Sequence, residues 1–159
     1  MGLISADMKR VVDEQRLGFV ATVCPDGTPN LSPKGTTAVW DADHLVFANI
    51  RSPGTIANLR QNAGVEVNFV DPFVRKGYRF KGVGSVLESG PLYDKVIAFY
   101  KERGVASAIR EVVMVRVLSA EPIDSPAYDL GATEAEVRAR WDLHWEAVRR
   151  GKTGSPTGE

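Results

Sequence analysis

The stretch of residues 30–62 constrains the fold of this chain more than any other part of the sequence. It contains two runs of strand character, 30–40 and 45–50, separated by the turn-forming residues 41–44. Strands joined by so short a turn pair antiparallel, because a parallel pair needs a crossover of about a dozen residues or more. A loop at 51–54 follows, so a helix begins almost directly after the second strand.

The start of that helix has the features of a site for an anionic group. The first backbone N–H groups of a helix lack partners within it, and their aligned dipoles favour negative charge. Arg51 directly precedes the start, and Lys34 adds a second cation if the hairpin places residues 32–36 beside 47–50. Residues 52–55, Ser-Pro-Gly-Thr, also suit an ordinary capped helix start, which is the commoner meaning of such a short motif.

Length and charge restrict the class of protein. The 159 residues fit one domain over 1–150, followed by a small polar tail, 151–159, that we expect to be disordered. The 43% hydrophobic and 25% charged residues are ordinary globular values. Because 20 Lys and Arg residues balance 20 Asp and Glu residues, we expect no binding to nucleic acid or to an anionic membrane surface.

The chain starts without a basic segment and a following apolar run, and no later stretch reaches the roughly 18 apolar residues of a membrane span. We therefore expect a cytoplasmic protein that does not enter the membrane. Cys24 is the only cysteine, so the sequence predicts neither an intrachain disulfide nor a metal site.

Further strands precede and follow the hairpin of residues 30–50. The β-branched run 19–23 and the segment 29–32 flank Pro25-Asp26-Gly27, which predicts a tight turn between two strands. Residues 65–70 alternate apolar and polar side chains with the period of a strand. The first part of the chain is therefore expected to form an antiparallel meander.

The last two strands carry more specific signals. Residues 78–87 contain Gly82 and Gly84, which indicate either a bend at a barrel corner or the close approach of another group. Residues 112–118 are almost uninterrupted apolar, as in a strand that is buried on both faces within a barrel or at a subunit interface.

Helices are predicted at 5–15, 91–103 and 134–150 from apolar residues spaced three and four apart. The last of them carries one apolar stripe made of Val137, Trp141, Trp145 and Val148. Six strands with flanking helices predict an α+β domain, whose sheet is expected to close into a small barrel because closure removes exposed strand edges.

The order of these elements resembles the FMN-binding split-barrel family typified by pyridoxamine 5′-phosphate oxidase. The resemblance covers roughly residues 5–123, and no single motif carries it. The segments that match are 17–23, 25–29, 32–36, 47–49 with Ser52 and Thr55, 58–62, 65–70 and 78–84. It implies a six-stranded antiparallel split β-barrel with flanking helices, which forms a homodimer and binds FMN in a groove at the dimer interface.

The resemblance also implies which residues contact the flavin. Four residues would follow the edge of the isoalloxazine ring: Ser32, Pro33, Lys34 and Gly35. Three would serve the ribityl chain and the phosphate: Asn49, Ser52 and Thr55. Arg51 and Lys81 would be cations at the phosphate or at the flavin edge.

The chain departs from the family pattern in two places. The family's usual Ser-Arg-Lys before the helix is here Ser52-Pro53-Gly54, which lacks two phosphate cations unless Arg51 or Lys34 replaces them. The Arg-x-His substrate motif of the authentic oxidase is not reproduced by residues 140–144, Arg-Trp-Asp-Leu-His. Oxidation of pyridoxamine phosphate is therefore not predicted.

Three functional hypotheses remain. The first is an FMN-dependent oxidoreductase that acts on an unidentified small molecule. Because a flavin carries its own redox chemistry, this hypothesis needs no catalytic triad and names no catalytic residue. The second is a reductase of the same fold that uses the deazaflavin F420. The third is a non-catalytic flavin or haem protein; haem ranks last because His44 lies in a turn and His144 on the polar side of the last helix.

The aromatic residues near the C-terminus have no assigned role at this point. Trp141 and Trp145 either cover the flavin of a partner subunit or pack the last helix against the barrel, and the spacing favours packing for at least one of them. Tyr128, in the loop before this helix, is a further candidate for a ring contact.

Overall fold

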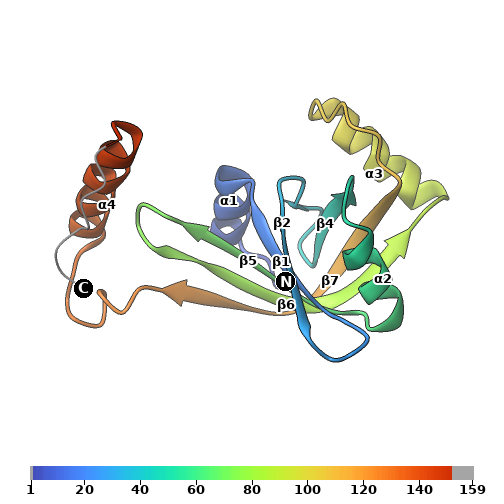
Figure 1. The fold of residues 1–159 in the computed structure, drawn as a ribbon, viewed down its shortest axis with the longest axis horizontal. Coiled ribbons are helices and arrows are strands. Elements are labelled where there is room, and N and C mark those ends of the chain that lie inside the picture. The colour runs from blue at the N-terminus through green and yellow to red at the C-terminus, as the bar shows by residue number, and fades with distance from the viewer. Residues whose placement is uncertain (1, 152–159) are drawn as a thin grey trace.

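A strongly curled antiparallel sheet organises this computed structural model, which describes residues 2–151 (Figure 1). The elements in chain order are α1 (Ala6–Gln15), β1 (Gly18–Val23), β2 (Pro29–Lys34), β3 (Ala38–Val39), β4 (His44–Asn49), α2 (Pro53–Gln61), β5 (Gly64–Asp71), β6 (Lys76–Leu87), α3 (Pro91–Glu102), β7 (Glu111–Asp124) and α4 (Glu134–Arg149). Apart from Gly151, the predicted tail lies outside the described residues.

The strand order makes the sheet a split barrel. The seven strands of the described residues run in the order β2–β1–β5–β6–β7–β4–β3, and every neighbouring pair is antiparallel. The two edge strands, β2 and β3, are consecutive in the chain, so the curl of the sheet brings its first and last strands together. The predicted α+β split barrel is confirmed, with seven strands instead of six because a turn at 35–37 divides the predicted strand 30–40 into β2 and β3.

The long strands β6 and β7 bend together at a bulge. Their register shifts between Lys81 and Gly82, which increases the local twist and turns the sheet. A Cβ atom on Gly82 would lie 2.3 Å from the carbonyl oxygen of Arg116, so only glycine fits there. The close approach predicted for Gly82 is confirmed.

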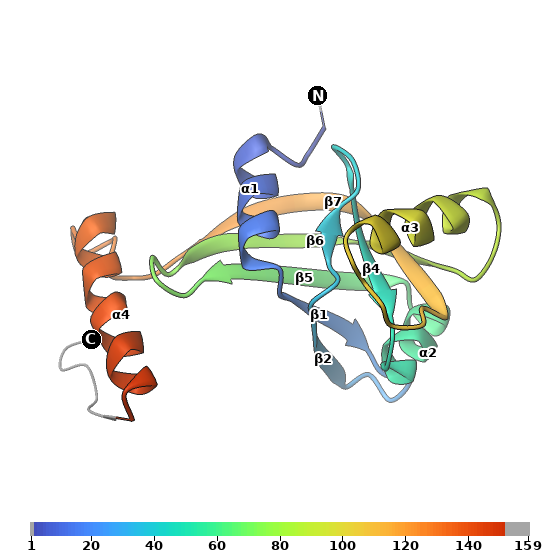
Figure 2. The ribbon, with the colours of Figure 1, turned by 90° about the horizontal axis from the view of Figure 1, so that it is seen from above.

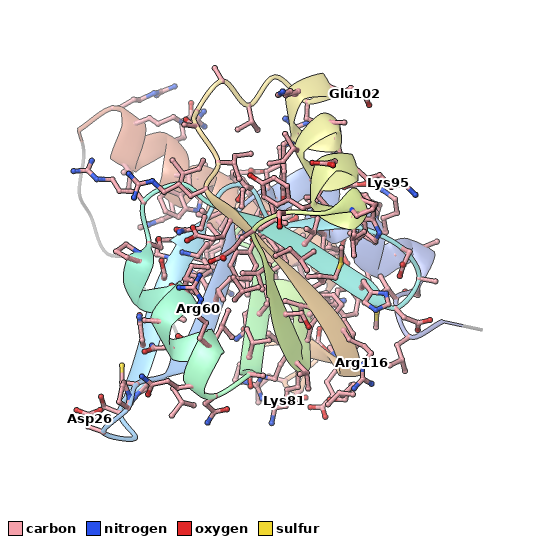
Figure 3. The ribbon with its side chains drawn as sticks, turned by 90° about the vertical axis from the view of Figure 1, so that its right-hand side faces the viewer. Asp26, Arg60, Lys81, Lys95, Glu102 and Arg116 are labelled. Atoms are coloured by element: carbon pink, nitrogen blue, oxygen red, sulfur yellow. The ribbon has the colours of Figure 1, made fainter. Side chains whose placement is uncertain are left out.

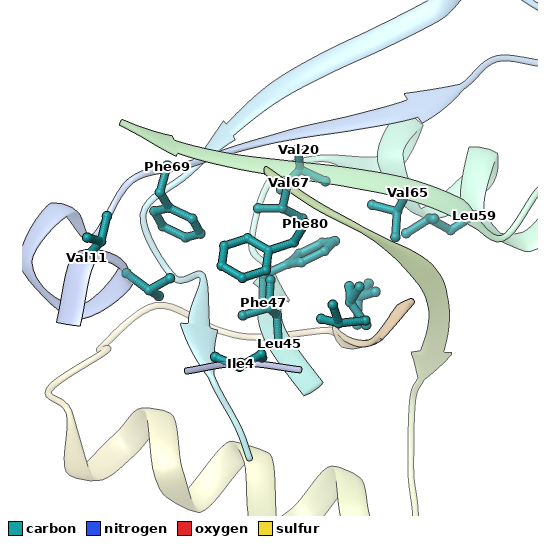
Figure 4. Close-up of a cluster of buried hydrophobic side chains, with 14 of the residues drawn as sticks. Ile4, Val11, Val20, Leu45, Phe47, Leu59, Val65, Val67, Phe69 and Phe80 are labelled. Atoms are coloured by element: carbon teal, nitrogen blue, oxygen red, sulfur yellow. The ribbon is translucent and has the colours of Figure 1, made fainter. Parts of the chain in front are cut away.

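The barrel interior is filled by one cluster of apolar side chains (Figure 4). Val20, Val67 and Phe80 come from paired positions of β1, β5 and β6, and Phe47 enters from β4. Helix α2 closes one end of this cluster with Leu59, which Figure 4 shows next to Val65. The barrel is therefore a packed core and not a channel.

A second apolar cluster lies between the sheet and α3. It takes Val46 from β4, Val112 and Met114 from β7, and Val96 and Tyr100 from α3. Strand β4 and residues 112–115 of β7 are thus buried on both faces, one against the barrel interior and the other against α3. The apolar run 112–118 is therefore covered within one chain up to residue 115, whereas Leu118 is 52% exposed.

Helix α4 stands apart from the barrel, beyond the far end of β6 and β7 (Figures 1 and 2). Its bounds are close to the predicted 134–150, but only Val137 of its apolar stripe is fully buried. The predicted polar, exposed position of His144 is wrong: its ring is half-buried and lies 5.2 and 5.3 Å from the ring centroids of Trp141 and Trp145. Within residues 2–151, no helix is long and apolar enough to cross a membrane.

Candidate functional site

The buried polar side chains of the described residues all fall within one third of the chain. These side chains are Thr22, Lys34, Thr37, Asn49, Thr55 and Asn58. They come from the end of β1, from β2 and the turn that follows it, from the end of β4 and from the first two turns of α2. Buried polar groups are costly unless they have partners, so a concentration of them marks a candidate binding site.

Lys34 is the most unusual member of this group. Its side chain is on the inner face of β2 and only 6% of the residue is exposed. Its Nζ donates to the Ser32 hydroxyl at 2.9 Å and lies 5.8 Å from the ring centroid of Phe47, and no carboxylate of residues 2–151 pairs with it. Burial alone lowers the pKa of the Lys34 ammonium. A buried cation without a carboxylate partner suits an anionic ligand.

The turn between β2 and β3 joins this strand to the end of β4. The Thr36 hydroxyl accepts from the Ala48 N–H at 3.0 Å and is 3.3 Å from the Ala48 carbonyl oxygen. The turn thus lies beside Ala48, and the Lys34 ammonium lies near Phe47. The role of Lys34 as a second cation at the start of α2 stays a prediction.

Asn49 fixes the loop between β4 and α2. Its Oδ1 accepts from the Ser52 N–H at 2.8 Å, and its Nδ2 donates to Glu111 on β7 at 2.7 Å. Ser52 occupies the N-cap position of α2 and Pro53 its first turn, as expected for an ordinary helix start, but the Ser52 side chain accepts no hydrogen bond from the helix. The hydroxyl of Ser52 and the first N–H groups of α2 are left for another partner.

The inner face of α2 carries two of the six buried polar residues, and we call these six residues the polar cluster. Asn58 donates from Nδ2 to the Thr22 hydroxyl at 3.0 Å, and the same nitrogen lies 3.6 Å from the Cys24 sulfur. Thr55, one turn earlier, is buried on the same helix. The contact between Asn58 and Thr22 holds the helix against the C-terminal end of β1, which pairs with β2.

A cavity of about 320 Å³ lies at the start of α2 and brings three arginines together. It is lined by Arg51, Arg60 and Arg110 together with Asn49, Ser52 and Glu111. Arg60 forms an ion pair with Glu88 and lies 3.8 Å from Glu111, whereas neither Arg51 nor Arg110 forms an ion pair with any described residue. The cavity therefore has cations available even though positions 53 and 54 supply none.

A match to a family model over most of the chain identifies the family. The sequence model described as pyridoxamine 5′-phosphate oxidase matches residues 4–138, which is most of the chain. The chain belongs to the pyridoxamine 5′-phosphate oxidase family. No curated protein matches it.

Solved structures agree with this family fold. HupZ of Group A Streptococcus is 29% identical with a TM-score of 0.70, over 77% of this chain and 95% of that one. An FMN-binding protein from Syntrophomonas wolfei is 14% identical with a TM-score of 0.62, over 74% of this chain and 84% of its own. A protein named F420 reductase is 18% identical with a TM-score of 0.58, over 74% and 98%. The last two show likeness of fold alone.

The residues predicted from the pyridoxamine 5′-phosphate oxidase family fall on two stretches. Ser32, Lys34 and Gly35 belong to β2 and its turn, where Gly35 lines a separate cavity with Thr36 and Arg103. Pro33 belongs to the same strand, but its side chain is on the outer face, opposite Phe19. Asn49, Arg51 and Ser52 line the cavity at the start of α2, and Thr55 is buried on that helix. That the two stretches form one flavin site stays a prediction.

Lys81 is on neither stretch. It is on the outer face of β6, with its Nζ 3.9 Å from Glu66, which also pairs with Arg79 at 3.0 Å. Figure 3 shows Lys81 at the lower edge of the molecule, away from Arg60 of α2. The pairing with Glu66 leaves Lys81 less available to a phosphate than Arg51 or Arg110.

The prediction from sequence missed Thr22, Asn58, Arg110 and Glu111. Asn58 had a usable signal, because it is a polar residue at a helix position flanked by the inward-facing Ile56 and Leu59. The other three had none, since they reach the site only through strand pairing and helix packing.

Proposed function

We propose that this protein binds FMN at the polar cluster and uses it as an oxidoreductase acting on a small molecule. The observation that carries the proposal is Lys34, a buried ammonium whose partner is a hydroxyl and not a carboxylate. Membership of the pyridoxamine 5′-phosphate oxidase family and the fold likeness to an FMN-binding protein support a flavin as the ligand.

The residues present fit a flavin phosphate. Ser32, Lys34 and the turn at Gly35 offer donors along β2, and β2 is an edge strand, so one side of its backbone pairs with no other strand of the described residues. Asn49, Ser52 and Thr55 would hold the ribityl chain and the phosphate, since hydroxyls and unpaired N–H groups suit an anion at a helix start.

Arg51 would replace the phosphate cations that residues 53 and 54 lack, because it lines the cavity at the same helix start. FMN would supply the electron-transfer chemistry. The contribution of the chain is to orient the ring along β2 and to place the Lys34 ammonium where it stabilises negative charge.

A homodimer is part of this proposal. The outer face of β1 and β2 exposes apolar side chains, with Leu31 64% exposed and Phe19 40% exposed. Strand pairing puts Leu31 in one row with Ala21, Glu66 and Lys81 on this face. A second copy that covers the apolar part would bring Lys81 to an interface, and only there would it contribute to a flavin site.

F420 is the second candidate cofactor. Pro53 and Gly54 replace two cations of the family pattern. A site with fewer cations binds the FMN phosphate less tightly and so selects FMN over F420 less strongly. The fold likeness to a protein named F420 reductase is consistent with this alternative. The cytoplasmic location and the single domain over 1–150 stay predictions.

Equilibrium titrations of the purified protein with FMN, riboflavin and F420, followed by fluorescence, test the cofactor. We expect FMN to bind at least roughly tenfold more tightly than riboflavin, since one charge-assisted contact to phosphate is worth about 1.5–3 kcal/mol. Tighter binding of F420 than of FMN would select the second candidate. Failure of all three to bind would refute a flavin function for this chain.

Sedimentation equilibrium tests the dimer separately. Leu31→Asp, on the exposed apolar face, is expected to shift the protein to a monomer, whereas Leu92→Asp, an exposed leucine of α3, is not. A monomeric wild type would refute the dimer and with it the role of Lys81.

A further inference from the structure

A large cavity lies at the other end of the sheet from the polar cluster. It measures about 1200 Å³ and lies between the turn that joins β5 to β6, the loop 125–132 and α4. Figure 1 shows α4 at the left of the molecule and α2 at the right, so the two regions are far apart. A cavity of this size holds a small organic molecule.

Arg75 forms one wall of this cavity. Its backbone is in the left-handed region at φ 54, and its guanidinium carbon lies 3.4 Å from the ring centroid of Trp141. Its Nε is buried and makes no hydrogen bond to any described residue. A buried donor without a partner costs about 1–3 kcal/mol. Because this nitrogen is covered by protein atoms, a ligand in the cavity would contact the guanidinium through its Nη groups.

The stacking on Trp141 engages the face of the Arg75 guanidinium, and Arg75 also lines the cavity. Arginine stacks on an aromatic ring through its face and binds carboxylate or phosphate through the N–H groups in its plane. Arg140, one residue before Trp141, lines the same cavity and forms no ion pair with the described residues. Two cations therefore border the cavity.

The one carboxylate on the cavity wall is already engaged. Glu136 accepts from the Thr133 N–H at 2.8 Å and from the Thr133 hydroxyl at 2.9 Å, and these bonds lower the pKa of Glu136. Its charge is thus held at the start of α4. The remaining walls contain Ser125 and the apolar side chains of Pro126, Val137 and Leu130, of which Leu130 is 86% exposed.

We propose that this cavity binds an organic oxyanion, with its carboxylate or phosphate group held by Arg75 and Arg140 and its apolar body against Leu130 and Val137. The stacked guanidinium supplies a rigid pair of donors and Arg140 a second charge. The neutral, apolar part of the ligand covers side chains that are otherwise left in water.

The test uses three probes of matched size: benzoate, phenyl phosphate and benzyl alcohol. NMR spectra of the ¹⁵N-labelled full-length chain report the Arg75 Nε–Hε resonance, assigned by its absence from Arg75→Lys. We expect one or both oxyanions to shift this resonance and the alcohol to leave it in place. The oxyanion that binds more tightly shows whether the cavity prefers a carboxylate or a phosphate ester as its ligand.

Variants distinguish a site from a general effect of arginine. Arg140→Gln, on an exposed helix surface, is expected to weaken binding at least roughly tenfold, the equivalent of one charged hydrogen bond. Arg149→Gln, an exposed arginine of α4 that does not line the cavity, is the matched control and should bind as the wild type does. Thermal unfolding of each variant shows that α4 is intact.

The proposal is wrong if neither oxyanion shifts the Arg75 resonance, or if benzyl alcohol shifts it as strongly. It is equally wrong if Arg140→Gln binds the oxyanions as tightly as Arg149→Gln does. None of these results bears on FMN binding at α2, which is measured in separate titrations.

Discussion

Replacing Lys34 with methionine tests the function of the polar cluster directly. Methionine keeps an unbranched apolar chain of similar length and removes the charge. The Lys34 ammonium has three donors, and one of them goes to the Ser32 hydroxyl at 2.9 Å, so two are left for a ligand. Loss of one charged hydrogen bond, worth about 1.5–3 kcal/mol, is expected to weaken FMN binding by roughly ten- to a hundredfold.

The same substitution is expected to stabilise the protein without ligand. Burial of an ammonium costs several kcal/mol of hydration free energy, and a single hydrogen bond worth about 1.5–3 kcal/mol offsets only part of it. The free energy of unfolding of Lys34→Met should therefore rise by on the order of 1 kcal/mol. A lysine with a purely structural role would give the opposite sign.

The pH dependence provides a second readout. Burial lowers the pKa of Lys34 in the folded state below its ordinary value of 10.5. Between the lowered pKa and 10.5 the folded protein binds fewer protons than the unfolded chain, so the stability of the wild type rises with pH across this interval. Lys34→Met lacks the titrating group, and its stability advantage should shrink as the pH approaches 10.5.

Urea unfolding and fluorescence titration with FMN measure both effects. Lys95→Met, an exposed lysine of α3 shown in Figure 3, is the matched control, and we expect it to change neither quantity. If Lys34→Met lowers the free energy of unfolding and leaves the FMN affinity unchanged, the assignment of Lys34 to a ligand site is refuted.

Two further substitutions test the fold around the site. Gly82→Ala places a Cβ atom 2.3 Å from the Arg116 carbonyl oxygen and should lower the free energy of unfolding by about 1–3 kcal/mol. Gly54→Ala, with open space around it, should change the free energy of unfolding by less than about 1 kcal/mol. Equal effects in urea unfolding would contradict the bulge geometry. Tyr100→Phe removes the bond from the phenol to the Thr36 carbonyl oxygen at 2.9 Å, and the buried acceptor should cost about 1–3 kcal/mol. Because burial raises the Tyr100 pKa above 10.0, the unfolded chain loses the phenol proton first, so wild-type stability should fall as the pH rises past 10.0, and Tyr100→Phe should lack this part of the decline in urea unfolding at alkaline pH.

Local patterns predicted most of the architecture because strands and turns are short-range features. The hairpin that pairs residues 38–39 with 45–46 and places Thr36 beside Ala48 follows from alternation, β-branched residues and a four-residue turn. The additional strand was missed because the turn at 35–37 carries no strong breaker apart from Gly35, and the predicted strand continued through it.

The partners of the site residues were harder to predict. Asn58 meets Thr22 across 36 residues of sequence, and Asn49 meets Glu111 across 62. Neither pair has a local signature, because each contact exists only after β1, β4, β7 and α2 have packed. The position of Lys81 was missed for the same reason. The alternation of side chains along β6 predicts which residues share a face with Lys81, but it does not predict that this face carries Glu66 of β5.

The sequence by itself determined the order of strands and helices, the helix start after β4 and the family resemblance, all of which rest on residues that are close together in the chain. Only the tertiary structure decided that Val112 and Met114 of the apolar run are covered by α3, that Lys34 is buried without a carboxylate, and that Arg75 stacks on Trp141. The physical reason is that burial and charge pairing depend on the curl of the sheet, which brings distant residues within contact distance.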